Sequence, residues 1–465
     1  HTCTARLMTI TSGLAAMLFN SFEYIIFYAV FFLVFFALPG LQAQVALIGV
    51  ASLYFYGSWS AAHVLLLLLV CALAYSAQHS SLQRFAPAFQ VTAVLLVLFV
   101  FKYFNFFAQS AEQLGLVMAT SSLVLPVGIS FYVFQAVSYV IDEKRQHIPR
   151  VSFAETLAYI AFFPQLVAGP IVRAHVFLPQ LQKRRVFNKY MFYTGLLLFA
   201  MGMFKKVVIA DNVGLFVDKV YETPGSTTAG NHLLAFYLYA IQIYYDFCGY
   251  SEMAIGIART LGFKFPRNFA RPYLAASITE FWRRWHISLS SWLRDYLYIP
   301  LGGNRRGRMR TYLNLALVML LGGLWHGAAW TFVVWGGIHG ALLAVERFTK
   351  YRPASAMARL AGMLITFHLV AVSWVFFRSP DFAAAGLFFQ GMLTTGSLTV
   401  ITGKFIAIKC LLLAALFVVI ECYSKVGTFL VLRNRKALLA GIFGYGILFF
   451  LLGNFEQSPF IYFQF

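Results

Sequence analysis

Long apolar runs, bounded by polar residues or by Gly and Pro, recur along the whole chain. A helix that crosses the hydrocarbon core of a bilayer needs roughly 20 mainly apolar residues. We interpret about 11 or 12 of the runs as transmembrane helices and one or two as re-entrant or interfacial pieces. The pattern therefore predicts an all-α polytopic membrane protein. The runs cover residues 22–38, 43–57, 61–77, 92–108, 122–141, 154–170, 191–210, 232–256, 311–345, 359–377, 383–395, 405–422 and 437–453.

The composition supports a membrane location. Of the 465 residues, 60% are hydrophobic and 11% are charged, whereas soluble domains carry about 25% charged residues. Residues 1–16 lack the pattern of a cleavable signal, and we expect them to be an N-terminal extension outside the fold. Residues 17–465 contain no soluble segment or polar linker. We therefore predict one membrane domain and no module that would bind nucleic acid.

The net charge of +20 is concentrated in short loops. Lys183, Arg184, Arg185 and Lys189 form one group, and a denser group lies within residues 259–310. Lys and Arg in short loops mark the cytoplasmic side of a membrane protein and attract anionic lipid headgroups. We therefore expect residues 259–310 to face the cytoplasm. Their density leaves a polyanionic ligand open as well.

His326 lies in an apolar segment without a charged residue from Thr311 to Ala344. A polar residue at membrane depth is expensive and is a functional candidate by default. Gly322 and Gly323 precede it by four and three residues, which would let a partner helix or a substrate approach closely. A neutral imidazole in such a dry site can accept a proton. We predict a catalytic base; the alternative is a histidine that bonds a neighbouring helix for packing alone.

A second candidate, His286, lies in an aromatic segment between residues 277 and 296. Large apolar side chains recur there every three or four residues, which predicts one amphipathic helix at the membrane interface with its aromatic face in the membrane. His286 falls on the aromatic side, so we expect it to point inward. The residues that define this side are Trp282, Trp285, Leu289, Trp292 and Tyr296.

A glycine-rich turn with several arginines follows that segment. Backbone N–H groups and guanidiniums of such a turn can bind phosphate oxygens. Asn304, Arg305, Arg306 and Arg308 are therefore candidate donor-binding residues. The alternative is an ordinary positively charged loop that only fixes topology.

Asp246 and Tyr250 stand four positions apart in an apolar run and share a helix face. Asp246 either orients a catalytic group or pairs with an arginine, and the second case is commoner. Proline and glycine open the run at Leu125–Tyr132, which suits a broken helix that lines a cavity. The predicted supporting residues of the site are Asp246, Tyr250, Trp282, Trp285 and Trp325.

The other histidines and the cysteines carry less information. His147 and His175 are expected in loops or at helix ends and need no special role, whereas His339 and His368 are expected to have structural duties. The 5 cysteines are scattered without a closely spaced pair. We therefore predict neither a disulfide framework nor a metal site.

Three segments together resemble the membrane-bound O-acyltransferase (MBOAT) family, most closely its bacterial branch of alginate O-acetyltransferases. They are Phe281–Ser290, the turn Leu301–Arg305 and Leu324–Trp330. One departure is Cys248 and Glu252, where the family pattern has Ser and Asp. The resemblance extends over most of residues 17–465, with further pieces at Lys102–Phe107, Leu125–Tyr132, Phe163–Pro170, Ser373–Arg378 and Phe460–Phe465.

The resemblance implies a ring of tilted helices around a thinned centre, where a tunnel lets a cytoplasmic thioester donor meet an acceptor from the other side. It implies that His326 is the active-site histidine and that His286 occupies the family's second polar position. In that chemistry His326 removes the proton of an oxygen nucleophile, and His286 polarises the carbonyl or positions the acceptor.

The same resemblance implies a donor, partners and a location. The expected donor is acetyl-CoA, whose phosphates Arg305, Arg306 and Arg308 would hold, and no cofactor is expected to be bound permanently. The branch works with a periplasmic acetyltransferase that modifies a polysaccharide. We therefore expect a multi-pass protein of the bacterial inner membrane.

Other functions stay open on the sequence. Transfer of D-alanine from a carrier protein to a cell-wall polymer is the alternative among the acyltransferases. A transporter would also explain polar groups in apolar runs, but we find no inverted repeat and no array of carboxylates in the membrane. A di-metal membrane oxidase lacks its closely spaced histidines. The polymer could be alginate, cellulose, peptidoglycan or another glycan.

Overall fold

The computed structural model describes residues 17–79, 86–225, 227–394, 408–420, 435–454 and 460–461. Within these residues the chain forms helices and no β-strand. This confirms the prediction of an all-α protein. The predicted extension, residues 1–16, lies outside the described residues.

Most helices in the first part of the chain contribute to one hydrophobic core. Several begin at a serine whose side chain accepts a backbone N–H, as Ser21 does for α1 and Ser60 for α3. The helices are α1 (Phe22–Ala37), α2 (Leu41–Gly57), α3 (Ala61–Ser76), η1 (Ala77–His79), α4 (Ala86–Leu98), η2 (Phe99–Tyr103), α5 (Phe104–Glu112), α6 (Ile129–Lys144), α7 (Phe153–Ile160), α8 (Phe163–Leu166) and α9 (Ala174–Leu181).

The second part of the chain contains the longest helices. They are α10 (Lys189–Met203), η3 (Phe204–Ala210), α11 (Asp211–Glu222), α12 (Ala229–Thr260), η4 (Pro272–Leu274), α13 (Ile278–Trp282), α14 (Ile287–Leu293), η5 (Arg294–Tyr298), α15 (Arg308–His326), α16 (Trp330–Thr349), α17 (Ala356–Arg378), α18 (Phe382–Leu393), the unlabelled helix Ile408–Ile420, and α20 (Arg435–Leu452).

Two predicted runs are broken in the structure. The run at 154–170 forms α7 and α8, because Pro164 lacks an N–H and lies in the first turn of a new helix. The run at 311–345 forms the hairpin of α15 and α16, which turns at Gly327. The proline and glycine at 126–128 precede α6, and Gly128 adopts φ 74° where a Cβ would lie 2.6 Å from the Leu166 carbonyl oxygen.

Glycines let neighbouring helices pack with their backbones close together. A Cβ at Gly323 of α15 would lie 2.2 Å from the carbonyl oxygen of Phe332 in α16. This confirms the predicted close approach at Gly323, whereas Gly322 faces the side chain of Leu293. A side chain at Gly323 would therefore separate α15 from α16.

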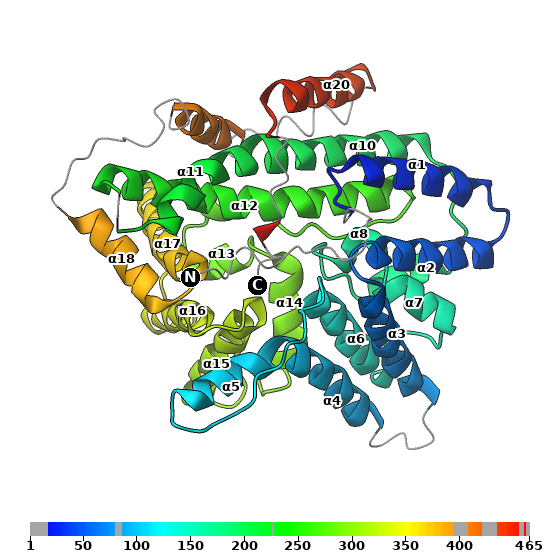
Figure 1. The fold of residues 1–465 in the computed structure, drawn as a ribbon, viewed down its shortest axis with the longest axis horizontal. Helices are drawn as coiled ribbons and strands as arrows, with labels where there is room; N and C mark the ends of the chain where they lie inside the picture. The colour runs from blue at the N-terminus through cyan, green and yellow to red at the C-terminus, as the bar shows by residue number, and fades with distance from the viewer. Residues whose placement is uncertain are drawn as a thin grey trace.

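The helices are arranged around α13 and α14 (Figure 1). Helices α1 to α4 and α6 to α8 lie on one side, and α15 to α18 lie on the other, where α5 contacts the start of α16 through Phe106 and Trp330. Helices α10 and α12 run side by side across one edge. The buried residues form two hydrophobic cores, one on the α1–α9 side and one among α11, α12, α16 and α17. Trp285 belongs to the second core and Leu289 to the first, so the chain passes from one core to the other at His286.

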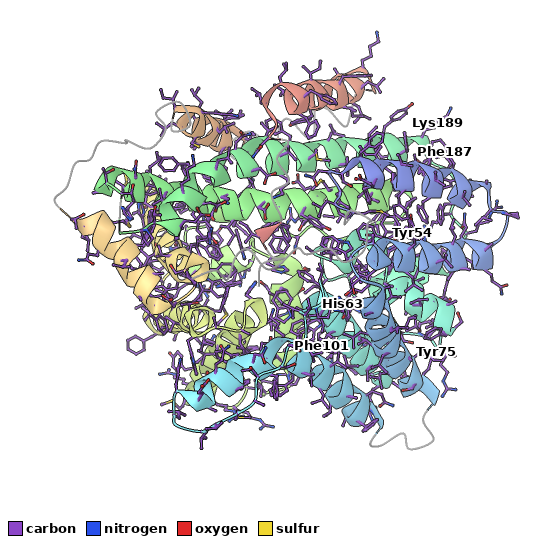
Figure 2. The ribbon with its side chains drawn as sticks, viewed as in Figure 1. Tyr54, His63, Tyr75, Phe101, Phe187 and Lys189 are labelled. Carbon is purple, nitrogen blue, oxygen red and sulfur yellow. The ribbon has the colours of Figure 1, made fainter. Side chains whose placement is uncertain are left out.

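Three helical runs among the described residues are long and apolar enough to cross a bilayer: Pro87–Glu112, Lys189–Glu222 and Ala356–Arg378. Side chains fill the spaces between the helices, and Lys189 lies at the outer edge where α10 begins (Figure 2). Further apolar helices of 10–17 residues can cross only where the bilayer is thinner. The predicted number of spanning helices therefore stays a prediction.

Large apolar side chains cover the outside of many helices. Phe22 and Leu33 of α1 are about 70% exposed, and so is Leu65 of α3. In water such surfaces would drive association, whereas lipid tails cover them at no cost. The outer faces of these helices therefore fit a bilayer.

The turn that carries Asn304 should be accessible from the cytoplasm. We expect Asn304→Cys to react with a membrane-impermeant maleimide only after the cells are permeabilised, because basic short loops stay on the cytoplasmic side. The background chain would carry serine at Cys3 and Cys422, since Cys71, Cys248 and Cys410 are buried. Val117→Cys, in the exposed loop at the opposite end of α6, is the control for the other face. Labelling of Asn304→Cys in intact cells would contradict the proposed orientation.

Candidate active site

The structure brings His286 and His326 together although 40 positions separate them in the sequence. Their ring centroids are 6.2 Å apart, and the residues are 0% and 3% exposed. His326 is the last residue of α15, and His286 directly precedes α14. The two imidazoles therefore meet where two helix ends converge between the two hydrophobic cores.

The predicted continuous helix around His286 is wrong. The segment breaks after Trp282, and His286 adopts a left-handed conformation (φ 41°, ψ 55°) before α14 begins. The break follows from backbone bonds to the preceding loop: the Ala270 N–H donates to Arg284, and the Ile287 N–H donates to Asn268. A non-glycine residue in this region is strained by roughly 1–3 kcal/mol. Such strain, held by surrounding contacts, is common at functional sites.

Most of the aromatic residues of the segment are buried in the protein and do not face lipid. Trp285 is 0% exposed and packs against Trp374 and Phe281. Trp292 is stacked on Phe134, with ring centroids 3.8 Å apart. The aromatic stripe therefore packs in the protein interior, and the amphipathic pattern reflects burial against other helices.

Asn268, which the sequence analysis did not single out, fixes the orientation of His286. Its Oδ1 accepts hydrogen bonds from the Ser288 N–H at 3.2 Å and from the Ser288 hydroxyl at 2.9 Å. Because a backbone N–H only donates, this atom of Asn268 is the oxygen. His286 Nδ1, 3.2 Å from the same oxygen, must therefore carry the hydrogen. The neutral ring then has its lone pair on Nε2.

Lys102 supports the other histidine. Its Nζ is buried and donates to the carbonyls of Trp325 (2.8 Å) and His326 (3.2 Å) and to the Ser130 hydroxyl (3.0 Å). The last carbonyls of a helix have no partner within the helix and carry partial negative charge, so a cation there satisfies both. Lys102 lies in the π-helical turn η2, a kind of irregularity that often marks functional sites.

Aromatic side chains surround the two imidazoles. The Trp325 ring lies 5.0 Å from that of His326 and 5.9 Å from that of His286. The Trp335 ring contacts His326 edge-on at 5.1 Å, and the Phe247 ring contacts His286 edge-on at 4.6 Å. The immediate surroundings of the pair are therefore largely apolar.

Trp282, a predicted supporting residue, and His339, a predicted structural residue, lie behind the aromatic side chains that surround the two imidazoles. The Trp282 ring is 5.8 Å from that of Trp335 and 5.1 Å from that of His339. His339 is buried, and its Nε2 lies 3.0 Å from the hydroxyl of Ser373. The expected structural duty of His339 fits this contact.

Asp246 pairs with a lysine and not with an arginine. Its Oδ1 lies 2.5 Å from Lys206 Nζ, which also lies 2.6 Å from Asp211, and its Oδ2 accepts the Ile461 N–H at 2.8 Å. The expected arginine partner is therefore wrong, because Lys206 reaches Asp246 from η3. Tyr250 is stacked between Phe19 and Phe460. These contacts tie the end of the chain to α12.

The arginine turn lies at the surface. Asn304, Arg305, Arg306 and Arg308 are all exposed, and Asn314 holds the turn by donating to the Gly303 carbonyl at 2.9 Å. The turn follows η5, which itself follows α14. It therefore stands at the outer end of the segment that begins at His286.

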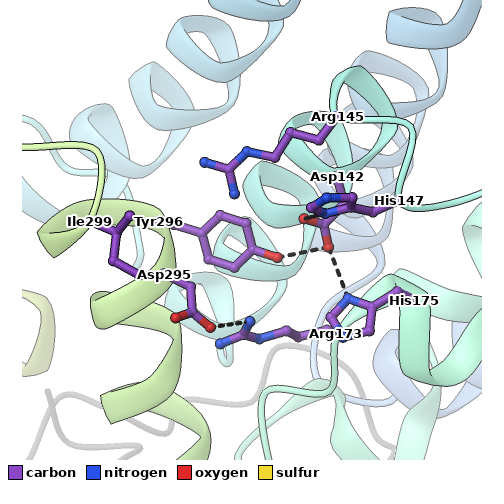
Figure 3. A pocket seen from close by; sticks show the side chains of 8 residues that line it. All are labelled: Asp142, Arg145, His147, Arg173, His175, Asp295, Tyr296 and Ile299. Atoms are coloured by element: carbon purple, nitrogen blue, oxygen red, sulfur yellow. Dashed lines mark hydrogen bonds and ion pairs between the residues drawn. The ribbon is translucent and has the colours of Figure 1, made fainter.

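A cavity of ≈ 770 Å³ opens beside η5 (Figure 3). Arg145, His147, Arg173 and His175 line it, although the sequence analysis gave the two histidines no role. These four residues come from the end of α6, the loop after it and the start of α9. Only the folded chain brings these positions together with η5.

Comparison with known proteins identifies the family. The model of the MBOAT, membrane-bound O-acyltransferase family matches residues 51–372. The chain belongs to this family. The match includes Lys102, Asn268 and both central histidines.

Named relatives are similar over much of the chain. A probable alginate O-acetylase of Azotobacter vinelandii is 44% identical over 66% of this chain and 63% of its own length. A peptidoglycan O-acetyltransferase of Helicobacter pylori is 36% identical over 74% of this chain and 72% of its own length. A teichoic acid D-alanyltransferase of Bacillus subtilis is 28% identical over 72% of this chain and 86% of its own length. The alignment thus spans less than two thirds of the Azotobacter relative.

Lys102→Met should destabilise the protein. The replacement keeps the length of the side chain but leaves two helix-end carbonyls without their donor, which removes about 1–3 kcal/mol from the free energy of unfolding. The measurement is the midpoint of thermal unfolding in detergent micelles. Lys189→Met is the matched control, because Lys189 is exposed at the start of α10. Equal midpoints for the two variants would show that the Lys102 contacts carry no stability.

Proposed function

We propose that this protein is a membrane-embedded O-acyltransferase. It moves an acyl group, most simply acetyl, from a cytoplasmic thioester donor across the membrane towards hydroxyls of an extracytoplasmic polysaccharide. The observation that carries the proposal is the pair of buried imidazoles, with centroids 6.2 Å apart, inside a chain of the MBOAT family. The alginate and peptidoglycan relatives support acetyl as the group and a polysaccharide as the acceptor.

The proposed reaction assigns His326 as the general base. Its imidazole removes the proton of the attacking hydroxyl, the hydroxyl oxygen bonds to the thioester carbonyl carbon, and the C–S bond breaks. The departing thiolate takes up a proton, which regenerates the neutral imidazole. Lys102 positions His326 by holding the end of α15.

His286 is proposed to position the acceptor. The sequence left two roles open for it, polarising the carbonyl or positioning the acceptor. A neutral ring that donates from Nδ1 to Asn268 can only accept a hydrogen bond at Nε2. An atom that only accepts hydrogen bonds cannot polarise a carbonyl. Holding a hydroxyl of the acceptor is the role that this tautomer supports.

We further propose a location, supporting residues, a donor and a partner for this protein. Residues 17–465 form one membrane domain in the bacterial inner membrane, and Trp282, Trp285, Trp325, Asp246 and Tyr250 support its tunnel. The donor, acetyl-CoA or a carrier-protein thioester, binds from the cytoplasm without a permanently bound cofactor. A periplasmic acetyltransferase partner completes the transfer to the polysaccharide.

D-alanyl transfer is the second candidate, because the Bacillus relative is a teichoic acid D-alanyltransferase. Membranes that contain the protein would be incubated with labelled acetyl-CoA or with a labelled D-alanyl carrier protein. Mass spectrometry then follows the label. Label from acetyl-CoA on protein or acceptor supports the acetyltransferase, and label only from the carrier supports D-alanyl transfer. Uptake of an unaltered solute into vesicles without acyl transfer would instead indicate a transporter.

His326→Ala and His286→Ala should each lower acyl transfer by about 10²–10⁴-fold, the usual contribution of a positioned proton acceptor. The double variant should transfer acyl groups as fast as the less active of the two single variants, because both residues act on one step. Transfer rates would be measured in lipid nanodiscs together with yield and monodispersity. His368→Ala is the control, since His368 is an exposed histidine bonded to Tyr237. Additive losses, or an active His326→Ala protein, would refute the shared step.

A further inference from the structure

The cavity beside η5 has a wall of side chains that contact one another. Asp142 is 2% exposed, and its carboxylate accepts the Tyr296 hydroxyl at 2.7 Å. His175 Nδ1 lies 3.3 Å from the same carboxylate, and His147 Nδ1 lies 3.7 Å from it. Figure 3 shows these side chains converging from three segments of the chain. The Asp142 carboxylate therefore already has partners within the wall.

Two arginines add positive charge to this wall. Arg173 pairs with Asp295 through Nη1 at 2.5 Å, whereas its Nη2 is buried and makes no hydrogen bond within the described part of the chain. The guanidiniums of Arg145 and Arg173 lie 5.6 Å and 5.1 Å from the centre of the Tyr296 ring. Arg145 is exposed and forms no ion pair among the described residues. Donors of two guanidiniums therefore remain available to a ligand.

Asp295 does not cancel this charge. Burial raises the pKa of its carboxyl, but hydrogen bonds from Arg294 and Arg173, together with their charges, hold the pKa below its ordinary value. Asp295 therefore stays ionised and fixes Arg173 in place, while Arg294 balances a further part of its charge. What remains is a cavity with surplus guanidinium donors, which fits an anion and above all a phosphate.

The cavity is linked to the two central histidines by two helical segments. On α6, Ser130 bonds Lys102 and Asp142 lines the cavity, and these 12 positions correspond to about 18 Å at the α-helical rise. On the other segment, His286 and Tyr296 are 10 positions apart. The cavity and the proposed site of acyl transfer are therefore about 18 Å apart along α6. A ligand that reaches both must be long and narrow.

A chain of aromatic ring contacts leads from the cavity to the two histidines. The Tyr296 ring lies 5.2 Å from Trp292, which is stacked on Phe134 at 3.8 Å. Phe134 in turn lies 5.3 Å from Trp325, whose ring contacts both histidines. An uncharged chain is the only part of a donor that suits this apolar wall.

We propose that this cavity binds the phosphate of a phosphopantetheine arm, with Arg145 and Arg173 as its ligands. The inference rests on the proposed function and identifies where the donor is held. The arm's phosphate would stay at the charged cavity, and its uncharged chain would carry the thioester towards His326. The exposed arginines of the turn, Arg305 and Arg306, would then meet the rest of the donor.

Two sources share this chemistry, coenzyme A and a carrier protein with a phosphopantetheine group. Both present the same phosphate ester at the head of the same arm. The cavity identifies the arm, and binding measurements with each source separate them.

The test measures binding by isothermal titration calorimetry with the whole chain in lipid nanodiscs. Wild-type protein should bind phosphopantetheine at least about tenfold more tightly than pantetheine, because one charge-assisted hydrogen bond has about that effect. Arg145→Gln should remove most of this difference. Arg150→Gln, an exposed arginine of the adjacent loop that does not line the cavity, is the matched control and should retain it.

Each outcome decides a separate question. Equal affinities of wild-type protein for phosphopantetheine and pantetheine, or equal effects of Arg145→Gln and Arg150→Gln, would overturn the phosphate site. Phosphopantetheine preference that depends on Arg145 supports it even in protein without transfer activity, whereas loss of transfer in His326→Ala tests the proposed function alone. With the site supported, tighter binding of coenzyme A than of a loaded carrier protein identifies coenzyme A as the source, and the reverse identifies the carrier.

Discussion

Two imidazoles buried side by side in an apolar interior set the requirements that the rest of the site meets. Such an interior offers little water, so each polar group must find its partner within the protein. Asn268 satisfies and orients the ring of His286, and Lys102 satisfies the carbonyls at the end of the helix that carries His326. Remove either support and a buried polar group is left without its hydrogen bond, which is the expensive case in a low dielectric.

The backbone around the pair follows from the same requirement. His286 can reach Asn268 only because the chain leaves the helix, adopts a left-handed residue and bonds to the preceding loop. His326 reaches the same place because α15 ends there, and Gly323 lets α16 pack against its last turn. The local strain at His286 is thus held by the loop and by the two cores on either side.

Local pattern was enough to predict part of this arrangement. The apolar runs specified the helices, and the isolation of His326 beside two glycines pointed to the centre of the fold. Spacing of the aromatic residues correctly gave the inward side of His286 but predicted one continuous helix, because the hydrogen bonds that break it come from Asn268 and Ala270. Lys102 stands inside the apolar run 92–108 but was not singled out as a site residue, and its contacts could not be foreseen because its carbonyl partners are 223 and 224 positions away. The same reason hid the partner of Asp246 and the cavity residues Arg145 and Arg173.

The separation of charge from the centre gives the proposed chemistry its physical basis. Carrying a phosphate into the apolar surroundings of the histidines would require its desolvation, which costs far more than one hydrogen bond returns. A thioester has no net charge and enters such a region readily. A donor that keeps its phosphate at Arg145 and Arg173 and extends an uncharged arm towards His326 avoids that cost. The distance between the cavity and the histidines then favours donors with a long arm over small activated acyl groups, which could not span it.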